Sequence, residues 1–330
     1  MEFEEILIRF RALGGIADNL TLRHGEFGRG LFTVNPKKAF RLCVPASLLV
    51  DPAWVELDSK EQLRIRPQSS SISEDAVAFF ELYQRHFGWG DGGKDSVAQH
   101  QRDLQALPPK LKNFLHVLGA ADELKQKPTT SYCLNRYFVN RQIGTKAGSR
   151  LMPIAELINH SQEGLPYLVD DGVTVTGMVK DEILTRYHSG LDSFHFFINY
   201  HFATPAHTAL SCEVTVEVPE FGPIEIKRMD HLANVNGAVR TPIVSRTEGK
   251  LTLSFVALAN QKNPSQPRKT FVELMKVNGM PKAVANNLFD GLLEHNRQVL
   301  SELIQECGLH SGTMTGTLNK VAGFQLASLT

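Results

Sequence analysis

The pattern of hydrophobic and polar positions changes several times along the chain. Apolar residues at positions 3–14 recur at helical spacing and stop at Gly14 and Gly15, which predicts a short amphipathic helix. From residue 20 to residue 50 the pattern becomes short strand-like runs broken by glycines, most clearly at 31–34 and 42–44. This part therefore predicts a helix followed by a domain of mixed helices and strands.

Helical periodicity returns in the middle of the chain. The segment 71–74 (SISE), which begins with Ser71, has the spacing of a capping box, and the helix that follows is expected to end at Gly88. A second helical stretch is expected over residues 93–126, with an interruption near Pro108. Because these helices stand between two strand-rich parts, they indicate an insertion into a sheet domain.

Strands return after Pro153 and give way to helices near the C-terminus. The runs 167–169 and 173–175 flank an Asp-Asp-Gly turn and predict a hairpin. A helix is expected over 193–202, a half-buried strand over 212–218, where apolar and polar residues alternate, and another strand over 251–256. Beyond the breaker cluster at 263–267 the period is helical, so the tail predicts a helical lobe.

Length and charge narrow the class of protein. The 330 residues suit one large domain with appendages or two domains, and 35 basic against 35 acidic residues give a formal charge of zero. That balance provides no general electrostatic footprint for nucleic acid or an anionic membrane. The acidic N-terminus, the lack of a long apolar run and four scattered cysteines favour a cytoplasmic protein with reduced thiols.

Three short segments carry candidate chemistry. Residues 25–32 (GEFGRGLF) place glycines two apart before a strand, which lets a ligand approach the backbone, although a tight turn without a ligand is the simpler interpretation. Residues 153–161 (PIAELINHS) are an apolar run that ends in three polar side chains. Residues 181–187 (DEILTRY) are followed by a second tyrosine and a phenylalanine at 200–202. Each segment taken alone is also explained by turn or core packing.

In their order and spacing, the three segments resemble the signatures of SET-domain protein methyltransferases, most closely the RuBisCO large-subunit lysine methyltransferase class. The resemblance implies an α+β fold, a SET-domain β-fold of short strands with an inserted helical segment and a mainly helical C-terminal lobe. It divides the chain into an N-terminal SET part (1–70), a helical insertion (71–130), a second SET part with the catalytic motifs (131–210) and a C-terminal lobe (211–330).

The resemblance also assigns roles to residues. It implies that S-adenosylmethionine is the cofactor and that Tyr187 is the active-site tyrosine. The cofactor-binding residues it implies are Phe27, Gly28, Arg29 and Gly30, mainly through backbone atoms, Arg136 toward the cofactor carboxylate, Asn159 and His160 toward its amino-acid and adenine ends, and Tyr200 and Phe202, with Phe202 against adenine.

The chemistry suits these residue types. Methyl transfer from a sulfonium is an in-line displacement, so the protein must align a neutral nucleophile and exclude water. An apolar channel favours the neutral amine of a lysine, and the Tyr187 hydroxyl, with the backbone carbonyls near Glu156 and Ile158, would orient it. No metal is required, and the histidines at 188, 195, 201 and 207 have the wrong spacing for one helical face.

Two departures from the family keep alternatives open. His201 stands where the family usually has glycine, and Glu156 where it has aspartate. The leading hypothesis is a protein-lysine methyltransferase whose protein substrate docks on the C-terminal lobe, as the resemblance implies. The alternatives are a histidine-directed protein methyltransferase and a non-catalytic SET-like interaction module.

Overall fold

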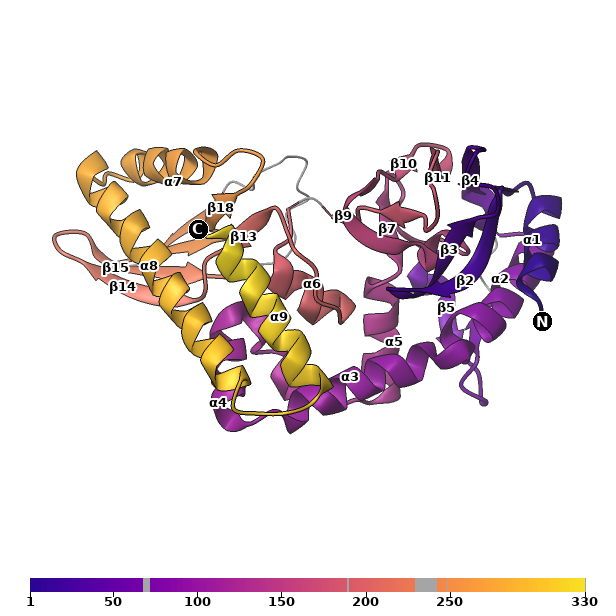
Figure 1. Cartoon of the computed structure of the whole chain (residues 1–330), viewed down its shortest axis with the longest axis horizontal. Coiled ribbons are helices and arrows are strands. Elements are labelled where there is room, and N and C mark those ends of the chain that lie inside the picture. Colours follow the sequence, from indigo (N-terminus) through magenta and orange to yellow (C-terminus); the bar gives the residue numbers. More distant parts are fainter. Residues whose placement is uncertain (68–71, 189, 229–241, 248, 330) are drawn as a thin grey trace. The chain divides into compact units, whose positions relative to one another are not determined.

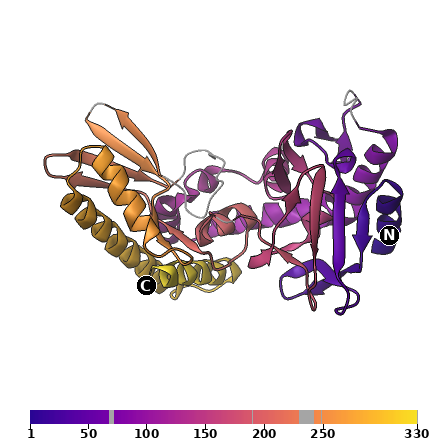
Figure 2. The ribbon, with the colours of Figure 1, turned by 90° about the horizontal axis from the view of Figure 1, so that it is seen from above.

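The computed structural model describes residues 1–67, 72–188, 190–228, 242–247 and 249–329. Contacts divide the chain into two compact units (Figures 1 and 2). Unit 1 comprises Met1–Gln99 and Pro128–Tyr187, and unit 2 comprises His100–Lys127 and His188–Thr330. Each unit is thus built from two separate stretches of sequence, while the domain boundaries expected from the sequence stay predictions.

Unit 1 opens with the predicted amphipathic helix, α1 (Phe3–Ala12). Its apolar stripe is fully buried at Ile6, Leu7 and Phe10. The helix ends before Gly14, whose φ of +88° is accessible to glycine at little cost. The helix stop that the glycine pair predicts is therefore confirmed.

The rest of unit 1 is made of short strands. They are β1 (Ile16–Asp18), β2 (Leu20–Gly25), β3 (Gly28–Thr33), β4 (Phe40–Pro45), β5 (Val55–Leu57), β6 (Leu63–Ile65), β7 (Gln142–Thr145), β8 (Gly148–Leu151), β9 (Asn159–Leu165), β10 (Leu168–Val169), β11 (Gly172–Gly177) and β12 (Leu184–Thr185). A four-stranded sheet has the order β1-β4-β11-β10, and β2–β3, β5–β6, β7–β8 and β9–β12 form separate pairs. The hairpin predicted around residue 171 is confirmed as β10 and β11.

Helices occupy the stretch between the two strand-rich parts, as the sequence predicts. They are α2 (Glu74–Phe87), α3 (Lys94–Ala106), α4 (Pro109–Leu115) and α5 (Thr130–Val139). The N-cap of α2 is Ser73, whose hydroxyl accepts a hydrogen bond from the Ala76 N–H at 3.3 Å. Ser71, where the capping box was expected to begin, lies outside the described residues. The largest core of unit 1 joins α1 and α2 to β3, β4 and β11.

Unit 2 combines a second sheet with long helices. Its strands are β13 (Thr208–Leu210), β14 (Val214–Val218), β15 (Gly222–Lys227), β16 (Ile243–Thr247), β17 (Lys250–Ser254) and β18 (Ala257–Asn260), and its other helices are α6 (Ser193–Tyr200), α7 (Gln266–Val277), α8 (Lys282–Cys307) and α9 (Thr313–Ser328). The order β14-β15-β17-β16 makes a four-stranded sheet. Figure 1 shows α8 beside both α7 and α9, and the three helices bury their apolar faces in one core with this sheet.

The sequence-based interpretation of the fold class is confirmed in these elements. The alternating run at 212–218 forms β14, in which Thr215 and Glu217 are exposed while Val218 is buried. The tail beyond residue 263 is helical throughout its described elements. Among the described residues, no helix is both long and apolar enough to cross a membrane.

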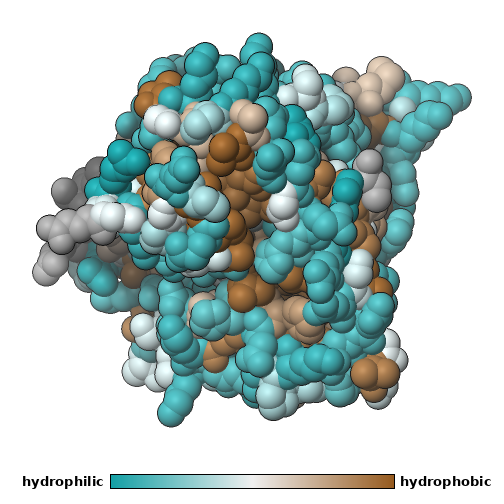
Figure 3. All heavy atoms as spheres, turned by 90° about the vertical axis from the view of Figure 1, so that its left-hand side faces the viewer, coloured by the Kyte–Doolittle hydropathy of each residue, from teal (hydrophilic) through white to brown (hydrophobic). Residues whose placement is uncertain are grey.

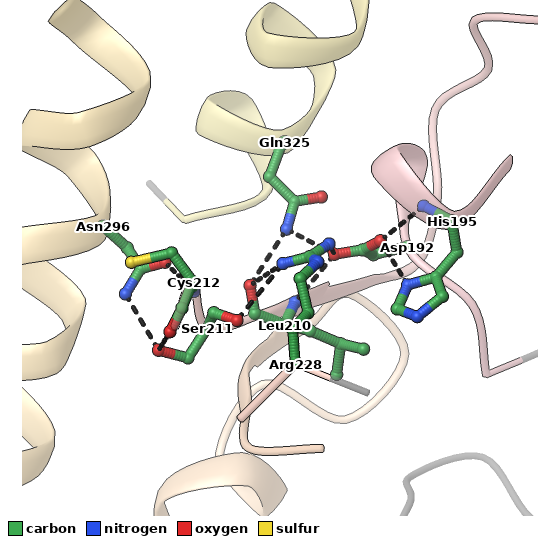
Figure 4. Close-up of polar contacts among 8 residues, drawn as sticks. All are labelled: Asp192, His195, Leu210, Ser211, Cys212, Arg228, Asn296 and Gln325. Atoms are coloured by element: carbon green, nitrogen blue, oxygen red, sulfur yellow. Dashed lines mark hydrogen bonds and ion pairs between the residues drawn. The ribbon is translucent and has the colours of Figure 1, made fainter. Parts of the chain in front are cut away.

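A buried polar cluster holds unit 2 together around Asp192 (Figure 4). Asp192 caps α6, because its Oδ1 accepts hydrogen bonds from the His195 N–H at 3.0 Å and from the His195 ring at 2.8 Å. Its Oδ2 forms an ion pair with the Arg228 guanidinium and accepts a hydrogen bond from Gln325 Nε2 at 2.8 Å. Both Asp192 and Arg228 have fully buried side chains. Burial alone would raise the pKa of Asp192, but Arg228 and His195 hold it well below its usual range.

The same cluster reaches α8 and β13. Arg228 Nη1 donates to the carbonyls of Leu210 and Ser211 at 3.0 and 3.2 Å. Asn296 on α8 accepts from the Cys212 N–H at 2.7 Å. One set of buried groups therefore connects α6, β13, α8 and α9, so removing one charge leaves its partner buried and uncompensated.

We expect Arg228→Met to destabilise unit 2 by about 3–5 kcal/mol, because the buried Asp192 then loses its counter-charge. Denaturant unfolding combined with hydrogen exchange on α6 and α9 measures the loss. Lys125→Ala is the control, since it removes an ion pair with Asp122 that is exposed on both sides. Equal unfolding free energies for Arg228→Met and the wild type would contradict the central role of this ion pair.

Candidate active site

The glycine-rich segment forms a tight hairpin. Strands β2 and β3 pair so that Gly25 lies opposite Gly28, and Glu26 and Phe27 make the turn between them. Gly28 has a φ of +90°, which favours glycine, and the Phe27 side chain is 54% exposed. The predicted turn is thus present at the start of a strand.

Gly30 leaves room for two polar side chains that come from far along the sequence. A Cβ atom at residue 30 would lie 2.5 Å from Asn159 Nδ2 and 2.6 Å from Glu182 Oε1. Neither distance is compatible with ordinary packing, so any larger residue would displace these groups. The glycine therefore permits Asn159 and Glu182 to lie against the hairpin.

Asn159 opens β9 and connects the hairpin to the segment that contains Tyr187. Its Nδ2 donates to the Arg29 carbonyl at 3.2 Å and to Glu182 Oε1 at 2.7 Å. Both partners are acceptors, so the amide nitrogen must face them. The Asn159 Oδ1 atom consequently points the other way.

The segment 181–187 lies between β3 and β9. On one side, the Thr33 N–H donates to the Asp181 carbonyl at 3.0 Å and the Ile183 N–H donates to the Leu31 carbonyl at 2.8 Å. On the other side, β12 pairs with β9 in parallel, and the Arg186 N–H donates to the Leu165 carbonyl at 3.0 Å. These hydrogen bonds fix the chain up to the residue before Tyr187.

Gly164 is needed for the approach of β12 to β9. A Cβ atom at this position would lie 2.6 Å from the Thr185 carbonyl carbon and 2.8 Å from its Cα. Both are backbone atoms that cannot turn aside. A glycine inside a strand is a known mark of close backbone contact, so the sequence carried a signal for this residue.

Tyr187 is held at its backbone and at its hydroxyl by residues 158–160, around the start of β9. Its hydroxyl donates to the Ile158 carbonyl at 2.6 Å, and its N–H donates to His160 Nδ1 at 3.1 Å. The two rings of Tyr187 and His160 lie 5.0 Å apart between centroids. The Tyr187 hydroxyl thus lies beside the Ile158 carbonyl, while the expectation that both groups orient a lysine amine stays a prediction.

His160 is a neutral imidazole in this environment. Only 6% of its surface is exposed, and burial lowers its pKa to about 4 although the Thr185 backbone acts to raise it. Because Nδ1 accepts the Tyr187 N–H, it cannot carry a proton itself. His160 therefore serves as an acceptor at neutral pH.

Glu156 lies in a buried polar cluster between α2 and α5. Its Oε1 accepts from the Tyr83 hydroxyl at 3.1 Å and from Gln84 Nε2 at 3.3 Å, and the Tyr137 hydroxyl donates to Gln84 Oε1 at 2.6 Å. Burial raises the pKa of Glu156, while these donors and Arg141 act to lower it. Its other carboxyl oxygen is buried, with no hydrogen-bond partner among the described residues.

The backbone just before Glu156 is strained. Ile154 has a φ of +69°, a conformation that β-branched residues rarely adopt. It precedes a single turn of 3-10 helix at Ala155–Leu157, after which the chain enters β9. Such strain persists where the surrounding structure determines the conformation, as it often does at functional sites.

The two predicted arginines occupy different surroundings. The Arg29 guanidinium forms an ion pair with Asp91 and donates to the Phe87 carbonyl at 2.7 Å. Its side chain is thus engaged at the end of α2, which is compatible with the expectation that residue 29 acts through its backbone. Arg136 lies half-buried on α5.

Two of the predicted aromatic residues, Tyr200 and Phe202, belong to unit 2. Tyr200 ends α6, and its ring centroid lies 6.1 Å from that of Phe202. Between them, His201 has a φ of +68°, and its N–H donates to the Phe197 carbonyl at 3.0 Å. This is the left-handed helix cap that glycine usually provides, and histidine is among the residues that tolerate it. The substitution at 201 therefore keeps the conformation expected of glycine.

Within each of the two units, the structure brings predicted site residues together. Within unit 1 the hairpin residues, Asn159, His160 and Tyr187 are joined through the contacts described above. Tyr200 and Phe202 are neighbours of each other within unit 2. Their roles stay predictions. Sequence reasoning missed Glu182, because an acidic residue beside Asp181 has the appearance of an ordinary exposed position.

Metal-binding and disulfide chemistry find no support in the described part of the chain. No group of three or more His, Cys, Asp or Glu side chains there could hold a metal ion. The four cysteines are all free thiols, and three of them are buried.

Comparison with known proteins gives structural but not sequence matches. No protein-family model matches the chain, and no curated protein sequence is similar to it. Among solved structures, the SET domain of LSMT bound to lysine and AdoHcy matches 99% of this chain and 88% of that chain, with a TM-score of 0.40 and 10% identity. Rubisco LSMT bound to AdoMet (10% identity) and bound to sinefungin and monomethyllysine (11% identity) each match 99% of this chain and 89% of that chain, with a TM-score of 0.41.

We expect the free energy of unfolding of unit 1 to fall by about 3 kcal/mol between pH 6.5 and pH 4, because the unfolded state binds a proton at His160 in a range where the folded state does not. This contribution is fully present above pH 6.5 and is lost as the pH falls toward 4. Denaturant unfolding across this range measures it. His160→Gln should flatten the profile, whereas His24→Gln, an exposed position on β2, should keep it; identical profiles for all three proteins would contradict the assignment.

Proposed function

We propose that this chain is an S-adenosylmethionine-dependent protein methyltransferase that transfers a methyl group to a lysine side chain. The observation that carries the proposal is the meeting of three distant motifs in unit 1. Asn159 donates to the hairpin carbonyl at Arg29, and the next residue, His160, accepts from the Tyr187 N–H. These are the residues to which the motif resemblance assigns cofactor binding and catalysis.

The donor and acceptor pattern of the site fits the cofactor. No hydrogen bond to Asn159 Oδ1 is found within the described residues, so this atom is open to a ligand that donates, such as an ammonium group. Phe27, Gly28, Arg29 and Gly30 would line the ligand with backbone atoms. His160 and Arg136 complete the proposed set within unit 1, while the roles of Tyr200 and Phe202, which belong to unit 2, rest on the motif resemblance alone.

Tyr187 is suited to orient the acceptor amine. Its hydroxyl donates its hydrogen to the Ile158 carbonyl, and a phenol oxygen can in addition accept a hydrogen bond from an amine or a weak C–H contact from a methyl group. Bound S-adenosylmethionine would supply the methyl group on a sulfonium, an electrophile that needs no metal. Apolar surroundings favour the neutral, nucleophilic form of a lysine amine.

The substrate is proposed to be a protein that docks on the C-terminal lobe. Helices α7, α8 and α9 form this part of unit 2 together with the sheet that contains β14 and β15. Figure 3 shows apolar atoms gathered in the middle of the face on this side, surrounded by polar residues. A mixed surface of this kind is typical of sites that bind other proteins.

Isothermal titration with S-adenosylmethionine and S-adenosylhomocysteine tests the cofactor directly. We expect saturable binding by the wild type and at least about a ten-fold weaker affinity for Asn159→Ala, because the hydrogen bond to the ligand's charged group is lost. Asn113→Ala on the exposed face of α4 is the control and should bind as the wild type does. A folded wild-type protein that binds neither ligand would overturn the proposal in favour of a non-catalytic module.

Tyr187→Phe tests the catalytic assignment separately. We expect labelled methyl transfer to proteins of a matched lysate to fall at least about ten-fold while cofactor affinity is kept, because only the hydroxyl is removed. Tyr132→Phe on α5 is the control. Unchanged turnover would remove Tyr187 from the mechanism. Mass spectrometry of the product separates methyl-lysine from methyl-histidine and so tests the acceptor.

A further inference from the structure

Glu182 is placed where no role follows from the motif resemblance. It lies in the segment between β3 and β9 and is bridged to Phe32 of β3. Its carboxyl group extends beneath the glycine hairpin, where Oε2 is 3.1 Å from the position that a Cβ of residue 25 would take. Oε1 is only 2.6 Å from the corresponding position at residue 30. Gly30 therefore makes room for this carboxyl group, and Gly25 does so to a smaller extent, because the Phe32 ring is closer to its Cβ position at 2.6 Å.

The contact of Glu182 with Asn159 decides the orientation of the asparagine amide. Glu182 Oε1 accepts from Asn159 Nδ2 at 2.7 Å, and the Arg29 carbonyl accepts from the same nitrogen at 3.2 Å. If the amide were flipped, Asn159 Oδ1 would face two oxygen atoms and gain no hydrogen bond. A carboxyl acceptor is stronger than a backbone carbonyl, so Glu182 is the dominant partner.

The orientation of the amide determines what the site can bind. With its nitrogen committed to Glu182, Asn159 presents only an oxygen to a ligand, and an oxygen selects a donor. The negative charge of Glu182 lies one amide group away and favours a cationic donor over a neutral one. The ammonium group in the amino-acid part of S-adenosylmethionine is such a donor.

From this geometry we infer that Glu182 is a positioning residue, which acts through Asn159 to make the site selective for the ammonium group of the cofactor. The inference rests on the proposed function and adds a residue to it. It also gives the hairpin glycines a second purpose, since Gly25 and Gly30 admit the carboxyl group that orients Asn159.

The test compares two ligands that differ in the amino-acid part. S-adenosylmethionine carries the ammonium group, whereas 5′-methylthioadenosine lacks the whole amino-acid part. We expect Glu182→Met to weaken S-adenosylmethionine binding about ten-fold in isothermal titration and to leave 5′-methylthioadenosine binding unchanged. Glu182→Gln should recover part of the lost affinity, because its amide oxygen can still accept from Asn159 although the negative charge is gone.

Control variants distinguish the loss of Asn159 positioning from a general loss of structure. Asp181→Asn changes the neighbouring acid, whose side chain forms an exposed ion pair with Arg23 at 2.7 Å, and should bind both ligands as the wild type does. If Glu182→Met does not fold, Glu182→Ala serves the same comparison, because it adds no bulk between the strands. Thermal unfolding establishes that each variant is folded.

The outcomes distinguish this inference from the proposed function. A wild type that binds no S-adenosylmethionine overturns both. A wild type that binds it while Glu182→Met binds it equally well overturns the positioning role alone. If Glu182→Met lowers the affinity for both ligands equally, the positioning role is also overturned, because a merely structural residue would affect the binding of the two ligands alike.

Discussion

The candidate site depends on the insertion of one late segment between two strands. Residues 181–187 hydrogen-bond to β3 on one side and to β9 on the other, so their register is set by both neighbours. A shift of one residue would turn every side chain to the opposite face. This double constraint places Glu182 against Asn159 and Tyr187 against His160 without any contribution from loop flexibility.

The two units differ in how completely the hydrogen bonds of their key polar side chains are made within the protein. In unit 1, the amide nitrogen of Asn159 donates to two protein acceptors, while its amide oxygen has no hydrogen bond among the described residues. In unit 2, Asp192 is saturated by protein donors, and its charge is neutralised by Arg228. The Asn159 oxygen can therefore still accept a hydrogen bond. The hydrogen bonds of Asp192 instead fix α6, the helix that carries Tyr200. Buried groups whose hydrogen bonds are complete make a unit more rigid.

Much of the fold could be predicted from periodicity. The helix at 3–14, the break near Pro108, the hairpin around residue 171 and the alternating strand at 212–218 all follow from local patterns that tertiary contacts did not override. Local patterns contain no information on which distant segments pair. The parallel pairing of β9 with β12 and the grouping of 100–127 with 188–330 therefore emerged only in three dimensions.

The same limit applies to the site. The motif resemblance identified residues whose type is unusual for their position, such as Asn159, His160 and Tyr187. Glu182 has an ordinary type, and its importance comes from its contact with Asn159 at 2.7 Å, whereas Gly164 could be recognised as a glycine inside a strand. Residues that act through a neighbour are hard to recognise in a single sequence, because they do not contact the ligand themselves.

The interleaving of the two units has a consequence for the synthesis of the protein. When the first 99 residues have left the ribosome, the backbone groups of Leu31 and Thr33 that will pair with 181–183 still have no partner. The whole of 100–127, which belongs to the other unit, must be made before unit 1 can close. A nascent chain of this length exposes an open strand edge, the feature that most readily recruits other chains or a chaperone. Cleavage of the chain within residues 100–127 would therefore leave unit 1 divided between two polypeptides.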